Sequence, residues 1–289
     1  MLDTKSNLIS GLYLVSTPIG NLGDITHRAE EVLAAADVIA CEDTRTTGKL
    51  LELLGIKAKS FLPYHEHNAD TIRPKILALI ASGKSVALVS DAGTPLISDP
   101  GYRLVRECAR QGLYVTSCPG ASAVLTALQL SGLPSDKFLF CGFLPTKSGA
   151  RLSELQSLSS IEASLVFYES PHRLSDTLQA MAEVFTGRNA AVVRELTKRF
   201  EEAVRLPIAE LAAHYQETGA PKGEIVIVIA PPVKVTTEAI PTEAALLLSR
   251  LLKFMSVKDA SSVTSEHYNL SKKSLYNEAL KLKNGTESD

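Results

Sequence analysis

Apolar residues gather in short runs that alternate with stripes at helical spacing through the first half of the chain. The runs predict buried strands at 12–16, 38–41, 86–89 and 113–116. The stripes predict helices at 29–36, 50–54, 72–81, 102–111 and 121–130. The segment 61–68 has the composition of a loop, and 138–145 closes this half and begins a linker. Because strands alternate with helices, we expect a mostly parallel sheet in a first α/β domain over residues 1–135.

The second half has strands that lie closer together in sequence. We expect them at 163–168, 190–195, 200–206 and 224–229, with helices at 150–159, 173–185 and 208–217. This spacing predicts a second α/β domain with a mixed sheet over 136–232. Residues 231–237 have the composition of an exposed linker.

Three helical segments follow the linker, at 244–253, 256–267 and 272–281. The last two flank a tight turn at Asn269-Leu270, and Ser271 is a plausible N-cap for the final helix. This arrangement indicates a helix-turn-helix domain over 240–289. The segment from Arg250 to Lys283 contains seven Lys or Arg residues and three Asp or Glu residues. The domain is therefore either a basic surface for nucleic acid or a small bundle with solvated lysines.

Composition limits the function classes. The 289 residues are 45% hydrophobic, enough for about two domains, and the net charge of −2 gives no global basic signature. The four cysteines form no CxxC pair, so we expect free thiols in a reducing compartment. Cys/His ligand spacing, a signal peptide and a transmembrane run are all missing. We therefore expect a cytoplasmic protein with no metal and no membrane contact.

Loops rich in Gly, Pro and polar residues follow most of the expected strands. They lie at 17–24, 42–45, 90–101, 118–123, 168–173 and 194–198. Ligands of open α/β sheets bind at the carboxyl ends of the strands, so six such loops predict one bipartite site between the two domains. The spacing Gly20-x-x-Gly23 does not match GxGxxG, and neither a P-loop nor a GxSxG elbow occurs. Cys41 is followed by Glu42 and Asp43, which disfavour a nucleophilic thiolate.

Seven motifs carry a resemblance to a known family. They are Thr17-Pro18-Ile19-Gly20-Asn21-Leu22, Glu42-Asp43-Thr44-Arg45, Ser90-Asp91-Ala92-Gly93-Thr94-Pro95, Gly132-Leu133-Pro134-Ser135-Asp136, Gly142-Phe143-Leu144-Pro145, Tyr168-Glu169-Ser170 and Arg194-Glu195-Leu196-Thr197-Lys198. Over nearly the whole chain, the sequence resembles the tetrapyrrole methylase superfamily. The Tyr168–Arg173 run and the helical tail resemble its RNA-methylating branch more than its porphyrinoid branch.

This resemblance implies an activity. It is S-adenosylmethionine-dependent 2′-O-methylation of a cytidine ribose in 16S rRNA of the small ribosomal subunit, by a homodimer with the cofactor cleft between its two α/β domains. Two alternatives stay open: a porphyrinoid C-methyltransferase, and a non-catalytic RNA-binding protein on the same scaffold.

The resemblance also assigns cofactor-binding residues. They are Pro18, Asp91, Gly93, Thr94, Ile97, Ser122, Ala123, Tyr168, Leu196 and Gly223. Gly93 would be the point of closest backbone approach. The superfamily commonly carries Asp where this chain has Thr94, so a neutral hydroxyl or the backbone would hold the cofactor there, with Asp91 taking over the charge.

A ribose hydroxyl is a weak nucleophile and benefits from a general base. Candidates are Glu42, Asp43, His65, His67, Glu169 and Lys198. We favour the 42–45 loop, in which Glu42, Asp43 and Arg45 combine carboxylates with a guanidinium that can pair with phosphate. For RNA binding we expect Arg45, His65, Lys147, Arg173, Lys272 and Lys273.

Overall fold

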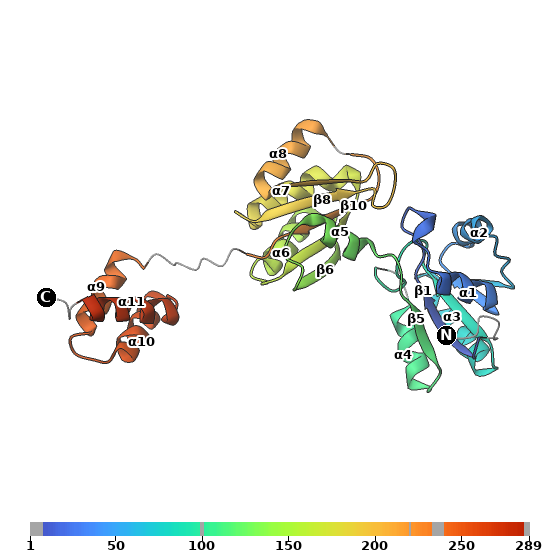
Figure 1. Ribbon diagram of the computed structural model, residues 1–289, viewed down its shortest axis with the longest axis horizontal. Coiled ribbons are helices and arrows are strands. Elements are labelled where there is room, and N and C mark those ends of the chain that lie inside the picture. The colour runs from blue at the N-terminus through green and yellow to red at the C-terminus, as the bar shows by residue number, and fades with distance from the viewer. Residues whose placement is uncertain (1–7, 99–100, 220, 233–239, 286–289) are drawn as a thin grey trace. The chain divides into compact units, whose positions relative to one another are not determined.

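The computed structural model describes residues 8–98, 101–219, 221–232 and 240–285, without the side chains of Lys273, Asn284 and Gly285 (Figure 1). The chain divides into two compact units, Met1–Pro232 and Val233–Asp289. The first unit contains two five-stranded sheets. The predicted linker at 231–237 falls largely on 233–239, outside the described residues.

The first sheet is entirely parallel, as predicted. Its strands run in the order β3-β2-β4-β1-β5, with β1 and β4 in the interior beside each other. The bounds are β1 (Gly11–Val15), β2 (Val38–Cys41), β3 (Phe61–Pro63), β4 (Ser85–Val89) and β5 (Val115–Cys118). Strand β4 is buried at all five positions, as expected of a parallel strand covered on both faces.

Helices cover both faces of this sheet. Helices α1 (His27–Ala35) and α2 (Thr44–Leu53) pack on one face through Val32, Leu33 and Leu51. Helices α3 (Ala69–Ala81) and α4 (Tyr102–Arg110) pack on the other through residues such as Ile76 and Leu104. A short 3-10 helix, η1 (Leu22–Asp24), follows β1. Each crossover loop therefore starts at the same edge of the sheet, where the strands end.

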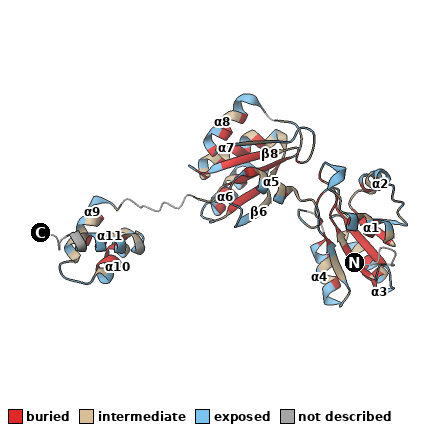
Figure 2. Ribbon diagram, in the orientation of Figure 1, coloured by how far each residue is buried: buried red, intermediate tan, exposed pale blue. Residues whose placement is uncertain are grey.

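The second sheet is mixed, also as predicted. Its order is β6-β7-β10-β8-β9, with β6 parallel to β7 and the remaining pairs antiparallel. The bounds are β6 (Phe138–Phe143), β7 (Ser164–Glu169), β8 (Asn189–Arg194), β9 (Glu202–Pro207) and β10 (Ile225–Ile229). Figure 2 shows buried residues concentrated in the strands.

Helices cover the two faces of the second sheet unequally. Helices α6 (Ser148–Leu158), α7 (Leu174–Val184) and α8 (Ile208–Thr218) pack on one face, and a 3-10 helix, η2 (Pro171–Arg173), precedes α7. Helix α5 (Ala123–Ser131) packs on the other face through Val124, Ala127 and Leu128. Ser122 caps α5 by accepting from Leu125 N, and Gly132 ends it in the left-handed region. Thus α5 follows the first sheet in sequence but packs against the second.

Two predictions about local structure were wrong. The 61–68 segment contains strand β3, which is only three residues long and buried only at Leu62, so its apolar run is too short to stand out. The 138–145 segment contains β6, an edge strand of the second sheet. Its pairing with β7 is irregular between Phe140 and Gly142, which breaks the alternation that a regular strand would show.

The second unit contains three helices among its described residues. They are α9 (Thr242–Leu251), α10 (Val257–Tyr268) and α11 (Lys272–Gly285), packed around Leu248, Ala260, Leu275 and Ala279. Asn269 adopts φ 52° and ends α10, so the tight turn between α10 and α11 lies where the sequence predicted it.

The four cysteines are free, and Cys41, Cys108 and Cys118 are buried, as expected. Burial raises the pKa of the Cys41 thiol, which opposes a nucleophilic role. Among the described residues, no helix is long and apolar enough to cross a membrane. Nor do the described residues form a group of three or more His, Cys, Asp or Glu suited to a metal ion.

Candidate functional site

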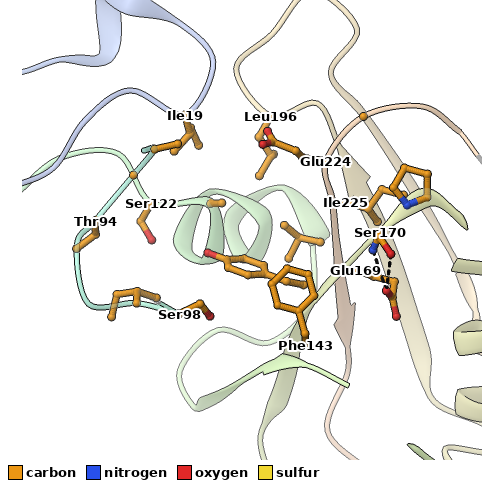
Figure 3. A pocket seen from close by; sticks show the side chains of 18 residues that line it. Ile19, Thr94, Ser98, Ser122, Phe143, Glu169, Ser170, Leu196, Glu224 and Ile225 are labelled. Carbon is orange, nitrogen blue, oxygen red and sulfur yellow. Dashed lines mark hydrogen bonds between the residues drawn. The ribbon is translucent and has the colours of Figure 1, made fainter. Parts of the chain in front are cut away.

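A cavity of about 400 Å³ lies within the first unit. Its walls come from the loops after β1, β4 and β5 on one side and from the ends of β6, β7 and β8 and the start of β10 on the other. Figure 3 shows Thr94, Ser98 and Ser122 facing Glu169, Ser170 and Ile225 across it. The volume falls in the range of small-molecule sites, and the lining is mostly apolar with a few polar groups.

Eight of the ten residues expected to bind a cofactor line this cavity. They are Gly93, Thr94, Ile97, Ser122, Ala123, Tyr168, Leu196 and Gly223. Pro18 and Asp91 do not line it, but each directly precedes a lining residue, Ile19 and Ala92 respectively. Ten further residues line the cavity that were not predicted to contact the cofactor: Ile19, Ala92, Ser98, Phe143, Glu169, Ser170, Pro171, Glu224, Ile225 and Val226. Three of them, Phe143, Glu169 and Ser170, lie within the Gly142–Pro145 and Tyr168–Ser170 motifs that carry the family resemblance.

Gly93 connects two of the loops on the first side of the cavity, which we call the first wall (the loops after β1, β4 and β5). Its backbone pairs with Thr17 through two hydrogen bonds of 2.9 and 3.1 Å, which join the loops after β1 and β4. Gly93 has φ 77°, and a Cβ there would lie 3.2 Å from Ile19 Cγ2. Both the conformation and the space favour glycine at this position.

The Thr94 hydroxyl links three loops. Thr94 Oγ1 donates to the carbonyl of Ala121 at 3.0 Å and accepts from Ser16 Oγ at 3.3 Å. Thr94, at the position where the resemblance implies an aspartate, is therefore tied to the loops after β1 and β5. It presents a neutral group to the cavity.

Two strained turns flank the cavity. Leu96 and Ser98, on either side of Ile97, have φ 74° and 66°. Glu195 and Thr197, on either side of Leu196, have φ 50° and 63°. A left-handed conformation is unfavourable for such residues and persists only where the surroundings enforce it. In each turn, the residue between the two left-handed positions, Ile97 or Leu196, lines the cavity.

Lys198 and Glu224 stabilise the turn around Leu196. Lys198 Nζ lies 2.9 Å from Glu195 Oε1 and 2.8 Å from Glu224 Oε2. The Lys198 hydrogen bond is the main cause that lowers the pKa of Glu195. The Glu195 side chain leaves no space for a Cβ at Gly223, which has φ 102°. Gly223 thus lets the turn reach the start of β10.

Glu169 is a buried carboxylate at the end of β7, with its side chain 1% exposed. It accepts from Ser170 N at 2.8 Å and from Thr177 Oγ1 at 2.6 Å, and it lies 3.4 Å from Arg173 Nε. Arg173 in turn donates to the carbonyl of Leu144 at 2.7 Å. The Arg173 side chain is 16% exposed, so the structure places this predicted RNA contact in a network that ties β7 to the loop after β6.

Aromatic rings form part of the second wall. The ring of Tyr168 meets Phe143 edge-on at 5.5 Å and Phe140 at 4.8 Å. Phe143 is 59% exposed although it lines the cavity. Such an exposed ring beside a cavity suits contact with a planar ligand.

A carboxylate cluster lies beside the first wall, at the ends of β2 and β4. Asp91 Oδ1 accepts from Asp43 N at 3.2 Å, and Asp91 immediately precedes cavity residues Ala92 and Gly93. Burial, and secondarily the charge of Asp91, raises the pKa of Glu42, while His65 acts in the opposite direction. The structure therefore brings together Glu42, Asp43 and Asp91, and burial together with the neighbouring carboxylates favours the protonated form of Glu42.

Asp43 and Arg45 form a local pair. Asp43 caps α2 by accepting from Arg45 N at 2.8 Å, and its other oxygen lies 2.7 Å from Arg45 Nη2. These bonds lower the pKa of Asp43 to about 2. The Arg45 side chain is 90% exposed. Asp43 thus orients a guanidinium that is open to an anionic partner.

His65 follows β3 and is held by Asn68. Asn68 Oδ1 accepts from His65 N at 2.9 Å, and Asn68 Nδ2 lies 3.1 Å from His65 Nε2. The Asn68 amide thus holds His65 through both its oxygen, at the backbone N–H, and its nitrogen, at the imidazole ring. Nδ1 is buried and has no partner among the described residues.

The remaining expected RNA contacts are not among the residues that line the cavity. Lys147 is exposed and precedes α6. Lys272, in the second unit, is exposed and donates to Ser262 Oγ at 2.8 Å. The side chain of Lys273 lies outside the described residues.

Two family models match the chain. "Tetrapyrrole (Corrin/Porphyrin) Methylases" covers residues 11–212, and "RsmI C-terminal HTH domain" covers residues 238–283. The first includes most of both sheets, and the second coincides with the three-helix unit.

Solved structures similar to this chain share its fold at low sequence identity. A uroporphyrin-III C-methyl transferase from Thermus thermophilus, complexed with S-adenyl homocysteine, is 19% identical with a TM-score of 0.54, covering 78% of this chain and 99% of that one. A diphthine synthase is 16% identical with a TM-score of 0.60, covering 76% and 89%.

Curated relatives are much closer in sequence. Proteins named ribosomal RNA small subunit methyltransferase I are 50% identical in Mesorhizobium japonicum, covering 94% of this chain and 92% of the relative, and 52% identical in Erythrobacter litoralis, covering 96% of each. The protein of that name in Escherichia coli is 44% identical, covering 96% and 97%. The chain therefore belongs to the tetrapyrrole methylase family, within the group of relatives named ribosomal RNA small subunit methyltransferase I.

Proposed function

We propose that this protein is a methyltransferase that uses S-adenosylmethionine to methylate 16S rRNA in the small ribosomal subunit. The observation that carries the proposal is the 400 Å³ cavity, lined from both sheets by eight residues expected to hold the cofactor. The naming of the relatives supports the RNA substrate. Because that substrate is ribosomal, we place the protein in the cytoplasm.

The cavity fits the proposed cofactor. Gly93 leaves its Cβ space empty beside Ile19, which allows close approach to the backbone. Thr94, Ser98 and Ser122 offer hydroxyls, and Tyr168 and Phe143 offer ring surfaces for a planar group. When bound, the cofactor supplies an activated methyl group. These residues would orient it and exclude water from the reacting atoms.

The target atom we propose is the 2′-hydroxyl of a cytidine ribose. A hydroxyl loses its proton reluctantly, so the step needs a base, and the Glu42 carboxylate is the group whose raised pKa suits it. The bound cofactor would supply the methyl group to the hydroxyl oxygen, and Glu42 would take up the hydroxyl proton. Asp43 would act by positioning, since it holds both α2 and Arg45.

RNA would be held by basic side chains of both units. The exposed Arg45 guanidinium is the strongest candidate for a phosphate contact. Lys147, Lys272 and Lys273 remain candidates, with His65 as a contact near Glu42. For Arg173 we propose a structural role instead, since its guanidinium bonds the Leu144 carbonyl and lies beside Glu169.

Neither alternative function is favoured. A porphyrinoid C-methyltransferase is disfavoured because the relatives above 40% identity carry a ribosomal RNA name and because the C-terminal HTH domain matches. A non-catalytic RNA-binding protein would not need a 400 Å³ cavity with strained turns on both sides.

We also propose that the protein acts as a homodimer. Phe138 and Leu139 on edge strand β6 are 42% and 37% exposed, and Leu125 on α5 is 51% exposed. Exposed apolar side chains on a strand edge and on a helix suit a self-complementary interface. Light scattering should give the dimer mass for the wild type and a monomer for Phe138→Asp. Leu53→Asp, at a residue 62% exposed on α2, is the control.

Labelled cofactor tests the activity. Purified protein should bind S-adenosylmethionine in a calorimeter and transfer the label to small subunits or to naked 16S rRNA, with the methyl found on a ribose after nuclease digestion. Absence of cofactor binding would overturn the methyltransferase proposal. A label on a base would overturn the 2′-O assignment alone.

A further inference from the structure

Helix α4 carries an exposed aromatic and basic face. Leu104 and Cys108 are buried against the first sheet, whereas Tyr102, Arg103 and Arg106 are exposed. The guanidinium carbons of Arg103 and Arg106 lie 5.8 and 6.0 Å from the centre of the Tyr102 ring. The ring itself is 60% exposed, and Figure 2 shows the outer surface of α4 as exposed.

This face is positive in a chain whose net charge is −2. Arg73 and Arg103 both pair with Asp70, and Arg110 pairs with Glu107. Arg106 forms no ion pair with any described residue. With Lys75, which is exposed on α3, helices α3 and α4 carry five basic side chains against two carboxylates, so their surface has an excess of positive charge.

The start of α4 lies beside the cavity. Tyr102 is four positions after Ser98, which lines the cavity, so their Cα atoms lie within about 14 Å of each other. Leu96, in the same loop, packs so closely on Gly101 that no space remains for a Cβ there. A strand of RNA with one nucleotide at the cavity could therefore reach Tyr102 with a nearby nucleotide.

We propose that Tyr102, Arg103 and Arg106 form an RNA-binding surface next to the methylated nucleotide. This rests on the proposed function, that ribosomal RNA is the substrate. The Tyr102 ring stacks on an unpaired base, and Arg103 and Arg106 pair with phosphates on either side of it. Bases splayed from single strands are read in this way, and an arginine beside an aromatic ring serves both contacts.

Kinetics on the full-length protein test this surface. Tyr102→Ala should raise the KM for the RNA substrate about tenfold, the loss expected when one stacked base loses its platform. Tyr102→Phe, which keeps the ring, should stay within about twofold of the wild type. Arg106→Ala should raise the same KM and reduce the slope of log K against log salt for RNA binding by about 0.7, the value for one lost phosphate contact on a single strand.

Arg110→Ala is the matched control. Arg110 lies on the same helix, about 12 Å further along its axis from Tyr102, and is already paired with Glu107. Its removal should leave the KM for RNA near the wild-type value. Affinity for S-adenosylmethionine should stay unchanged in all four variants.

The outcomes separate this surface from the general function. A wild type that neither binds the cofactor nor methylates RNA would overturn the proposed function. A wild type that methylates RNA, with Tyr102→Ala and Arg106→Ala unchanged in KM, would overturn only the α4 surface. Equal losses for Arg106→Ala and Arg110→Ala, or dissociation of the variants into monomers, would likewise overturn it.

Discussion

The side chain of Lys198 lies directly against Gly20. A Cβ built on Gly20 would stand 2.5 Å from Lys198 Cγ and 2.8 Å from the carbonyl oxygen of Leu196. The loop after β1 and the strained turn after β8 thus touch at a point where only hydrogen fits. Ile19 and Leu196, which line the cavity, are the immediate neighbours of this contact.

Gly20→Ala should therefore weaken cofactor binding. The added methyl group must displace the 195–198 turn, and overpacking of this kind costs about 1–3 kcal/mol. Calorimetry should show about a tenfold or larger loss of affinity for S-adenosylmethionine. The control is Gly48→Ala, where no atom lies within 4 Å of the new methyl. Because Gly48 is inside α2, that change should keep cofactor affinity and stabilise the fold by up to about 1 kcal/mol. Equal affinities in the two variants would contradict the contact's importance.

Glu42→Gln should abolish proton acceptance without affecting cofactor affinity. We expect the rate of methyl transfer to fall about 100-fold or more, as for the loss of a general base. In the wild type the rate should rise with pH through the raised pKa of Glu42 and then level off, because the base must be ionised. A wild-type pH profile retained by Glu42→Gln would exclude this residue as the base.

The Glu42 carboxyl also affects the stability of the fold, and its contribution changes with pH in the direction opposite to that of the methylation rate. The folded state binds the Glu42 proton more tightly than the unfolded chain, since folding raises its pKa. Its contribution to the free energy of unfolding therefore decreases as pH rises from the unfolded pKa through the folded one. Chemical denaturation of wild type and Glu42→Gln across this range should show a weaker decline in the variant.

Thr94→Asp should not restore a superfamily-like site. Thr94 Oγ1 donates to the Ala121 carbonyl, and a carboxylate cannot donate there, so two acceptors would face each other. We expect a loss of about 1–3 kcal/mol in the free energy of unfolding and weaker cofactor binding. Thr94→Ser, which keeps the hydroxyl, should behave like the wild type. Tighter cofactor binding by Thr94→Asp would contradict the hydrogen-bond assignment.

Removal of residues 233–289 should separate cofactor binding from RNA binding. Every residue that lines the cavity lies within the first unit, so affinity for S-adenosylmethionine should be unchanged. The KM for RNA should rise about tenfold or more as basic contacts are lost. The double variant Lys272→Ala, Lys273→Ala should move the KM in the same direction by a smaller factor. An unchanged KM in the truncated protein would exclude the C-terminal unit as an RNA anchor.

Periodicity was sufficient to predict most of the fold. The parallel first sheet, the mixed second sheet and the three terminal helices follow from apolar runs and stripes that are long enough to read. Strand β3 was not predicted because three residues give no recognisable period. Strand β6 was not predicted because its irregular pairing near Gly142 breaks the alternation of buried and exposed positions. The packing of α5 on the second sheet could not be read at all, since an apolar stripe does not indicate which sheet it covers.

The site was predictable where glycine, proline and hydroxyl residues break a pattern, as at Gly93, Thr94 and Ser122. Ile19, Ile225 and Val226 also line the cavity, but in sequence they look like any residue of the core. Arg173 shows the opposite limit. Its positive charge led to the prediction of an RNA contact, whereas in the structure its guanidinium lies beside the Leu144 carbonyl and the Glu169 carboxylate.

The position of α5 has a consequence for synthesis on the ribosome. Its apolar face, formed by Val124, Ala127 and Leu128, packs on strands that include β10, and β10 ends at Ile229. Chains grow at about 5–20 residues per second, so α5 emerges about 5–20 s before its last partner strand. During that interval the first sheet can already form, because its last strand ends at Cys118. The nascent chain must therefore carry a finished first sheet beside an uncovered helix until the second sheet closes over it.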